Sequence, residues 1–139
     1  MLLHVIARGK IGRSSEAELV ERYLKRIAWP TKLTELGERT ALPAASSGSI
    51  TVLLDEKGKA LSSMDLARQL ERWRDRGTRE VRFVIGAADG HSTDERGSAD
   101  LLMSFGPATW PHLLVRAMLA EQLFRATSIL ANHPYHREG

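Results

Sequence analysis

The sequence predicts an α/β fold with a mostly parallel sheet that helices cover on both faces. Candidate strands and helices follow each other in the order β-α-β-β-α-β-α-β-α, and such alternation is typical of parallel sheets. The strongest candidate strands are continuous apolar runs, as expected for strands buried on both faces. The 139 residues contain no linker-like segment and no internal repeat, so we expect one domain spanning residues 1–139.

The first β-α-β unit is predicted from residues 2–38. Residues 2–9 form an apolar run that ends on a glycine, which indicates a buried strand. Ser15 and Glu18 have the spacing of a capping box, so a helix is expected to start there and to end before the Trp-Pro pair that follows. Residues 32–38 alternate weakly between apolar and polar side chains, which predicts a second, weaker strand.

The middle of the chain predicts a loop, a strand and a helix. Residues 39–49 are rich in serine, alanine, glycine and proline and are expected to form a loop. Residues 50–55 form an apolar, β-branched strand, and the sequence EKGK at 56–59 then predicts a glycine turn. A helix is expected to start at the cap Ser62 and to stop at Gly77.

The last third predicts two more strands and two helices. Residues 80–86 form another buried strand. Ser92 and Glu95 form a second capping box, which predicts a short helix before a strand at 100–105. A long helix is expected over about 110–131. Its mainly apolar stripe consists of Val115, Met118, Leu119, Gln122, Leu123, Ala126, Ile129 and Leu130.

The composition excludes several kinds of site. The chain has no cysteine, which excludes disulfides, a thiolate nucleophile and cysteine-based zinc sites, and which fits a protein of the reducing cytoplasm. No stretch approaches about 18 consecutive apolar residues, so no membrane span is expected, and the first residues lack the pattern of a signal peptide. The formal net charge of +3 permits nucleic-acid binding without establishing it.

Arginines are concentrated in the predicted helix that follows Ser62. Arg68, Arg72 and Arg76 are spaced i, i+4, i+8 and therefore form a stripe along that helix. Acidic residues are interleaved with these arginines. The stripe is either a solvated face with local ion pairs or a surface that faces phosphate groups.

The carboxyl ends of the predicted strands are the expected place for a ligand. Residues 55–59, 86–90 and 106–109 lie at those ends. VIGAADG lacks the GxGxxG spacing and the Walker lysine, so no nucleotide-phosphate site is expected. The glycine loop is either an ordinary tight turn or a place where the backbone approaches another ligand. Asp55 is either a turn acceptor or a ligand contact.

The predicted last helix and the terminal sequence HPYHRE hold the remaining candidates for chemistry. The pairs His112–Arg116 and Glu121–Arg125 are each four residues apart, a spacing typical of surface pairs. The two histidines of the terminal sequence lack the further ligands that a metal site needs, so no metal is expected. No GxSxG elbow indicates a serine nucleophile.

Four segments together closely resemble the RlmH family of SPOUT-class methyltransferases. They read VxLLDxxGK at 52–59, ERWRDRG at 71–77, FVIGAADG at 83–90 and ATWPHLLVRAMLAEQLFRATSILANHPYHRE at 108–138. The resemblance spans nearly the whole chain. Its last segment is the most specific, because buried and chemically able positions recur there at fixed spacing.

The resemblance implies a SPOUT-type α/β knot, with a deep trefoil knot in the C-terminal part, and an obligate homodimer. It implies methylation of N3 of pseudouridine 1915 in the 23S ribosomal RNA of the assembled ribosome, with S-adenosylmethionine (SAM) as the cofactor. In such a protein, backbone groups of three loops hold the cofactor. The matching residues are Leu54, Gly86, Ala87, Gly90, Phe105, Gly106, Pro107, Ala108, Thr109 and Trp110.

The resemblance also implies that the tail lies near the cofactor and helps to build the RNA site, through Tyr135, His136 and Arg137. N3 of a uracil-type base carries a proton, which a neutral histidine can accept. An arginine can stabilise the resulting negative charge, and a tyrosine can stack on an extruded base. We expect His136 to be the proton acceptor. Further substrate contacts are expected from Arg68, Arg72, His112, Arg116 and Arg125.

Two departures from the family pattern leave alternatives open. The family's glycine loop reads Gly-Gly-Pro-Glu-Gly, whereas Ala87, Ala88 and Asp89 stand in its interior here. A positive φ at Ala87 would be strained and would weaken cofactor binding. Residues 37–49 are fewer than in typical members, so some RNA contacts are expected to be lost or supplied elsewhere. The alternatives are a non-catalytic, ribosome-associated dimer and a knotted methyltransferase that acts on another RNA nucleotide.

Overall fold

The computed structural model describes residues 1–87 and 90–137 and confirms the predicted order of strands and helices. Within these residues the strands are β1 (Leu2–Arg8), β2 (Thr31–Leu36), β3 (Ser49–Ala60), β4 (Glu80–Ile85) and β5 (Leu101–Ser104). The helices are α1 (Ser15–Arg26), α2 (Ser63–Asp75), α3 (Thr93–Ser98) and α4 (His112–Leu130). None of the described helices is both long enough and apolar enough to span a membrane.

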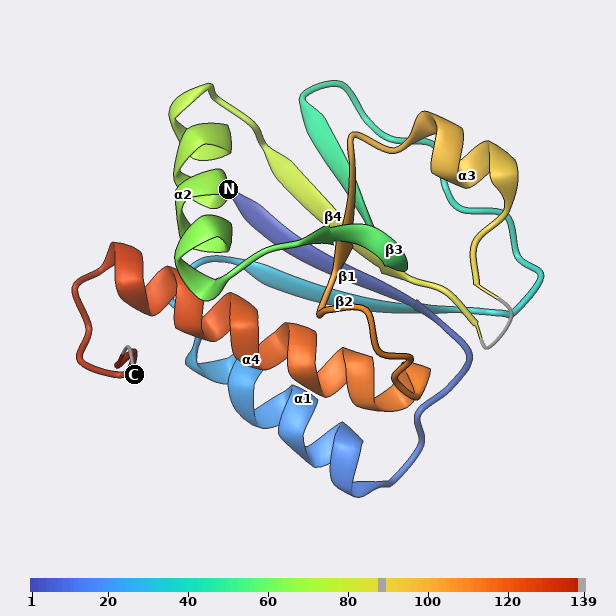
Figure 1. Cartoon of the computed structure of the whole chain (residues 1–139), viewed down its shortest axis with the longest axis horizontal. Coiled ribbons are helices and arrows are strands. Elements are labelled where there is room, and N and C mark those ends of the chain that lie inside the picture. Colours follow the sequence, from blue (N-terminus) through green and yellow to red (C-terminus); the bar gives the residue numbers. More distant parts are fainter. Residues whose placement is uncertain (88–89, 138–139) are drawn as a thin grey trace.

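The five strands form one parallel sheet in the order β2-β1-β4-β3-β5. The parallel sheet predicted from the apolar runs is therefore confirmed. β5 follows β4 in the chain but lies beyond β3, at the edge of the sheet. The chain then returns as α4, which lies between α1 and α2 (Figure 1). The C-terminal knot implied by the family resemblance is consistent with this path.

The main hydrophobic core lies between one face of the sheet and the helices α1, α2 and α4. Leu3 and Phe83 from the sheet meet Leu70 of α2 and Leu123 of α4, and all four side chains are fully buried. Burial of such a side chain contributes about 1.5–3 kcal/mol. The opposite face has a smaller apolar cluster centred on Ile6, Leu53 and Val84, which segment 37–48 and the surroundings of α3 cover through Leu42 and Ala99.

α4 is buried on a second side that the predicted apolar stripe does not include. Ala117 and Ala120 pack against Val20 of α1, and Phe124 contacts the ring of Tyr23 with 6.1 Å between the ring centroids. The stripe predicted for the helix was therefore too narrow. A helix that lies between two others buries two faces, and small residues on the second face let α1 approach closely.

The cap of α1 corrects one prediction. The N-cap is Ser14, whose Oγ accepts a hydrogen bond from the amide of Ala17 at 3.1 Å. Ser15 is the first residue of the helix, so the predicted capping box with Glu18 does not form there. The two boxes that do form are at Ser62, with Asp65, and at Ser92, as predicted.

The predicted glycine turn at 56–59 is wrong, because β3 continues through these residues to Ala60. Pairing with β5 shifts register between Leu54 and Lys59, which indicates a bulge. Gly58 is needed there for close approach: a Cβ atom on it would lie 2.6 Å from the backbone of Leu102 and Met103. A glycine is required at this position, but it is required because the backbone of β5 lies close to it and not because the chain turns there.

Candidate functional site

A cavity of about 620 Å³ opens at the carboxyl ends of β4 and β5 and beside the register shift within β3. Three separate segments line it: Leu54, Asp55 and Glu56 of β3, the loop after β4, and the connection from β5 to α4. Nine of the ten residues predicted to hold the cofactor line this cavity, and Pro107 does not. His112, predicted as a substrate contact, lies in the same wall. The structure therefore brings the three predicted loops together.

The glycine loop makes a tight turn in which Gly86 and Gly90 lie close together. The Gly90 amide donates to the Ala87 carbonyl at 2.9 Å, and Gly90 has a φ of +81°, which favours glycine. A Cβ atom on Gly86 would lie 3.0 Å from the Gly90 carbonyl carbon. Ala87 is not among the residues with a positive φ, so the strain predicted for it is absent. The predicted departures Ala88 and Asp89 lie outside the described residues.

The same cavity contains Asp55 and Glu56, from a segment predicted to lie near a ligand, and Arg96, which was not predicted there. Asp55 accepts a hydrogen bond from the Lys57 amide, as a turn acceptor would, but it also pairs with Arg96, with 2.9 Å between Oδ2 and Nε. Glu56 accepts a hydrogen bond from the Thr109 hydroxyl at 2.8 Å, which links β3 to the β5–α4 connection. An acidic residue at a strand end was the available signal for this wall.

His91 also lines the cavity, although the sequence analysis assigned it no role. It is 8% exposed, and its Nε2 lies 2.8 Å from the Leu54 carbonyl oxygen. Because a carbonyl only accepts, Nε2 carries the proton of this hydrogen bond. His91 therefore fixes the position of the Leu54 carbonyl within β3, where cofactor contact is predicted.

The C-terminal tail folds back onto α4. The Tyr135 ring packs against Phe124, with 4.6 Å between ring centroids, and the Arg125 guanidinium lies 4.7 Å from the Tyr135 ring centroid. Arg125 in turn bonds to Glu121 through Nε and Nη2, both at 2.7 Å. The predicted Glu121–Arg125 pair thus forms, and it holds the tail. Arg137 is exposed at the end of this arrangement.

Burial raises the pKa of one tail residue, and a contact with Arg125 selects the tautomer of a neutral ring in another. Burial, together with the hydrogen bond to Tyr23, raises the pKa of Tyr135 to about 12, so its phenol is neutral near pH 7. The Nη1 of Arg125 lies 3.2 Å from Nδ1 of His136. A guanidinium cannot accept a hydrogen bond, so Nδ1 accepts and the proton of a neutral ring lies on Nε2.

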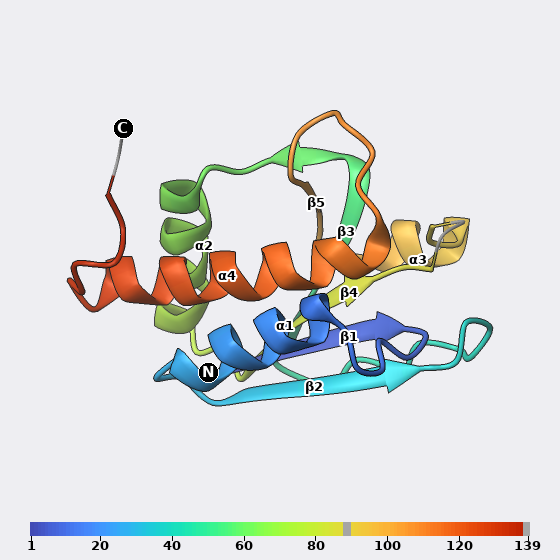
Figure 2. The same cartoon turned by 90° about the horizontal axis from the view of Figure 1, so that it is seen from below.

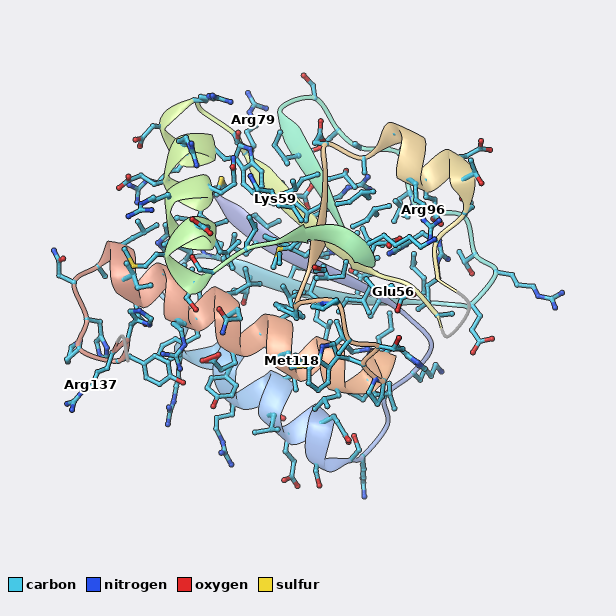
Figure 3. All side chains as sticks on the ribbon, viewed as in Figure 1. Glu56, Lys59, Arg79, Arg96, Met118 and Arg137 are labelled. Carbon is cyan, nitrogen blue, oxygen red and sulfur yellow. The ribbon has the colours of Figure 1, made fainter. Side chains whose placement is uncertain are left out.

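The cavity and the tail lie at opposite ends of α4. The helix has 19 residues, which corresponds to a length of about 28 Å. Figures 1 and 2 show the tail at one end of α4 and the β5–α4 connection and α3 at the other. In Figure 3, Glu56 and Arg96 lie on one side of the molecule and Arg137 on the other. Within a single chain, the tail is therefore not near the predicted cofactor site.

Arg116 corrects a prediction about the substrate site. Its side chain is 1% exposed, and it bonds to Glu35 at 2.5 Å and to the backbone carbonyl of Gly9 at 2.7 Å. The Arg116 hydrogen bond lowers the pKa of Glu35. The predicted RNA contact and the predicted surface pair with His112 are both wrong, because the guanidinium lies inside the protein. Spacing along one helix could not show partners on other segments.

The arginine stripe on α2 is exposed, as both interpretations of it require. Arg68 lies 3.9 Å from Asp65, whereas the carboxylates of Glu71 and Asp75 pair with Arg74 at 4.0 and 3.6 Å. The interleaved acids therefore leave Arg72 and Arg76 without an ion-pair partner among the described residues. Those residues also contain no group of three or more side chains that could hold a metal ion.

Comparison with known proteins identifies relatives over the whole chain. The family model described as Predicted SPOUT methyltransferase matches residues 29–136. A curated relative from Erythrobacter litoralis, named ribosomal RNA large subunit methyltransferase H, is 69% identical over 140 aligned residues that cover 100% of both chains. Relatives with the same name from Rhizorhabdus wittichii and Zymomonas mobilis are 65% and 58% identical, also over 100% of both chains.

A solved structure supports the fold independently of sequence. The probable methylase family protein from Haemophilus influenzae aligns with a TM-score of 0.64 at 10% identity. The alignment covers 98% of this chain and 70% of the other.

Proposed function

The chain belongs to the SPOUT methyltransferase family, together with relatives named ribosomal RNA large subunit methyltransferase H, and we propose that it methylates N3 of a pseudouridine in 23S ribosomal RNA. The methyl donor in this proposal is SAM, the substrate is the assembled ribosome, and the nucleotide is the one numbered 1915. Ribosomes as substrate place the enzyme in the cytoplasm.

One observation supports the cofactor most strongly: three segments far apart in the sequence meet in one cavity. Its volume of about 620 Å³ is in the range of sites for molecules of cofactor size. Gly86 and Gly90 lie close together in the wall of this cavity, so the ligand would meet backbone there and no side chain of these two residues. SAM supplies an electrophilic methyl group when bound, so much of the protein's contribution is the positioning of that group.

The tail residues suit the other half of the reaction. Attack by N3 requires that its proton leaves or that the anion of the base is stabilised. Tyr135 is neutral and bonded to Glu121, with 3.3 Å between the two oxygens, so it serves to anchor the tail and not to accept the proton. For His136 to accept the proton through Nδ1, its bond with Arg125 must first open.

The positions of the cavity and the tail support a homodimer. The reaction needs both, yet α4 separates them by about 28 Å within one chain. We infer that the tail of a second copy completes the cavity of the first. A two-fold symmetric dimer would then contain two such shared sites.

Mixed dimers test this sharing. Gly90→Val should damage the cavity, because Gly90 has a φ of +81°, and His136→Ala should damage the tail. Each variant alone is expected to be inactive. A purified heterodimer of the two has one intact site, and about half of the normal activity per dimer is expected. A heterodimer without activity would show that each chain completes its own site.

We propose that the arginine stripe of α2 contacts phosphates of the ribosomal RNA. Arg72 and Arg76 are exposed and unneutralised, and each lost phosphate contact should reduce the dependence of binding on salt. A triple variant with alanine at Arg68, Arg72 and Arg76 is therefore expected to bind ribosomes with a smaller salt slope. An unchanged slope would mean that the stripe is only a solvated face.

Transfer of labelled methyl groups tests the proposed function directly. Ribosomes that lack the modification and free ribosomal RNA would be incubated with the protein and labelled SAM. Label is expected on a single pseudouridine, and only in the assembled ribosome. Label on another nucleotide would assign a different substrate to the enzyme. A folded dimer that transfers no label would indicate a non-catalytic protein.

A further inference from the structure

Among the described residues that line the cavity, Arg96 is the one with a permanent positive charge. It belongs to α3, and it pairs with Asp55 of β3. In Figure 3, Arg96 lies on the same side of the molecule as Glu56. An arginine in the wall of a ligand site can bind an anionic group of the ligand.

Asp55 holds Arg96 in a fixed orientation. The Asp55 side chain is 4% exposed, and its Oδ2 lies 2.9 Å from Nε of Arg96. Its other oxygen accepts a hydrogen bond from the Lys57 amide at 2.9 Å, so the carboxylate itself is fixed. The ion pair therefore uses the inner nitrogen of the guanidinium and leaves the two terminal nitrogens for another acceptor.

One terminal nitrogen lies near Gly90, and neither terminal nitrogen has a hydrogen-bond partner among the described residues. Nη2 is 3.8 Å from the position that a Cβ atom on Gly90 would occupy. The Arg96 side chain is 42% exposed, so this end of it is accessible from the cavity. A planar pair of N–H donors matches the two oxygens of a carboxylate.

We propose that Arg96 binds the amino-acid carboxylate of SAM and that Asp55 positions Arg96 for this contact. The proposal rests on the proposed function, because it assigns one part of the cofactor to one wall of the same cavity. SAM has one carboxylate and two positive groups, the ammonium and the sulfonium. Among the described residues of the cavity wall, Arg96 carries a positive charge that can pair with the carboxylate, and the carboxylate of Glu56 is the one that Asp55's ion pair leaves for a positive group.

Decarboxylated SAM tests the contact, because it retains both positive groups and lacks only the carboxylate. Calorimetric titration of the full-length protein would compare the two ligands. A hydrogen bond to a charged group contributes about 1.5–3 kcal/mol, so the normal protein should prefer SAM by at least about tenfold. In Arg96→Gln this preference should disappear through weaker binding of SAM, while binding of the decarboxylated ligand is not weakened.

Two further variants complete the experiment. Arg96→Lys keeps a cation beside Asp55 but loses the planar pair of donors, so an intermediate preference is expected. It also replaces Arg96→Gln if the latter fails to fold in a thermal unfolding test. Arg22→Gln removes an exposed arginine of α1 and should leave the affinity for both ligands unchanged.

Several results would overturn the assignment. Equal losses of affinity for both ligands would mean that Arg96 only maintains the wall of the cavity. Unchanged affinity for SAM would exclude the contact, and a raised KM for ribosomes in that case would assign Arg96 to an RNA phosphate. Failure of the normal protein to bind SAM or to transfer methyl groups would contradict the proposed function itself, which is a separate outcome.

Discussion

Replacing Arg116 by methionine is expected to lower the free energy of unfolding by about 3–5 kcal/mol, the cost of removing one partner from a buried ion pair. The guanidinium is 1% exposed and binds Glu35 and the carbonyls of Arg8 and Gly9, at 2.5, 3.1 and 2.7 Å. Methionine fills much of the volume but leaves both carbonyls without these donors. Such a loss is a large part of the total stability of a typical domain, which is about 5–15 kcal/mol.

Urea unfolding at one fixed protein concentration would measure this loss, since the stability of a dimer depends on concentration. Arg22→Met, at an exposed position of α1, serves as the control and should change stability by no more than about 0.5 kcal/mol. A loss below about 1 kcal/mol in Arg116→Met would refute the reasoning. It would mean that the three bonds of Arg116 contribute little beyond those made with water in the unfolded chain.

The same pair predicts a pH dependence. The hydrogen bond from Arg116 lowers the pKa of Glu35 from its ordinary value of 4.5. A carboxylate with a lowered pKa stabilises the fold above pH 4.5, and this contribution is lost as the pH falls through the lowered value. The normal protein should therefore lose stability more steeply below pH 4.5 than Arg116→Met does. Parallel acid profiles would contradict the assignment.

Three other changes have expected outcomes. Gly58→Ala should lower stability by about 1–3 kcal/mol in thermal unfolding, because the new methyl group would meet backbone at 2.6 Å, and a neutral result would mean that β5 shifts freely. Tyr135 should stabilise the folded tail below pH 10, and this stabilisation should be lost as the pH rises towards 12. An ultraviolet titration would measure the ionisation of the phenol, and ionisation near pH 10 would show that the ring is not buried in solution. His136→Ala should keep the fold and the dimer but lose most methyl transfer, and removal of residues 134–139 should abolish it; full activity in either variant would remove the tail from the mechanism.

The elements of the fold were predictable because each one has a local cause. Apolar runs predicted the buried strands, the cap Ser62 predicted the start of α2, and the capping box of Ser92 and Glu95 predicted the start of α3. The errors arose where the conformation of a segment depends on contacts with a distant part of the chain. Gly58 was assigned to a turn because nothing near it in sequence shows the backbone of β5 beside it.

The sequence predicted the loops of the candidate site but not the ion pair between Asp55 and Arg96 in its wall. Leu54 and Gly90 were found through their motifs, and both line the cavity. Asp55 was left undecided, because its partner Arg96 is 41 positions further along the chain and lies on another element. The tail was expected to lie near the cavity, but within one chain the two lie at opposite ends of α4. The sequence alone does not show at which end of the helix each of them lies.

The length of α4 has a consequence for how this protein tolerates change. One end of the helix carries the cavity wall at His112 and the other carries the tail, so an inserted residue would turn one relative to the other by about 100° and move it by about 1.5 Å. Within segment 37–48, residues 44–48 are exposed, whereas Leu42 covers an apolar cluster of the sheet and the carbonyls of Thr40 and Pro43 accept hydrogen bonds from Arg8 and Arg82. We expect insertions and deletions to be accepted at residues 44–48, and a fixed residue count in α4 to be as strict a requirement as any single side chain.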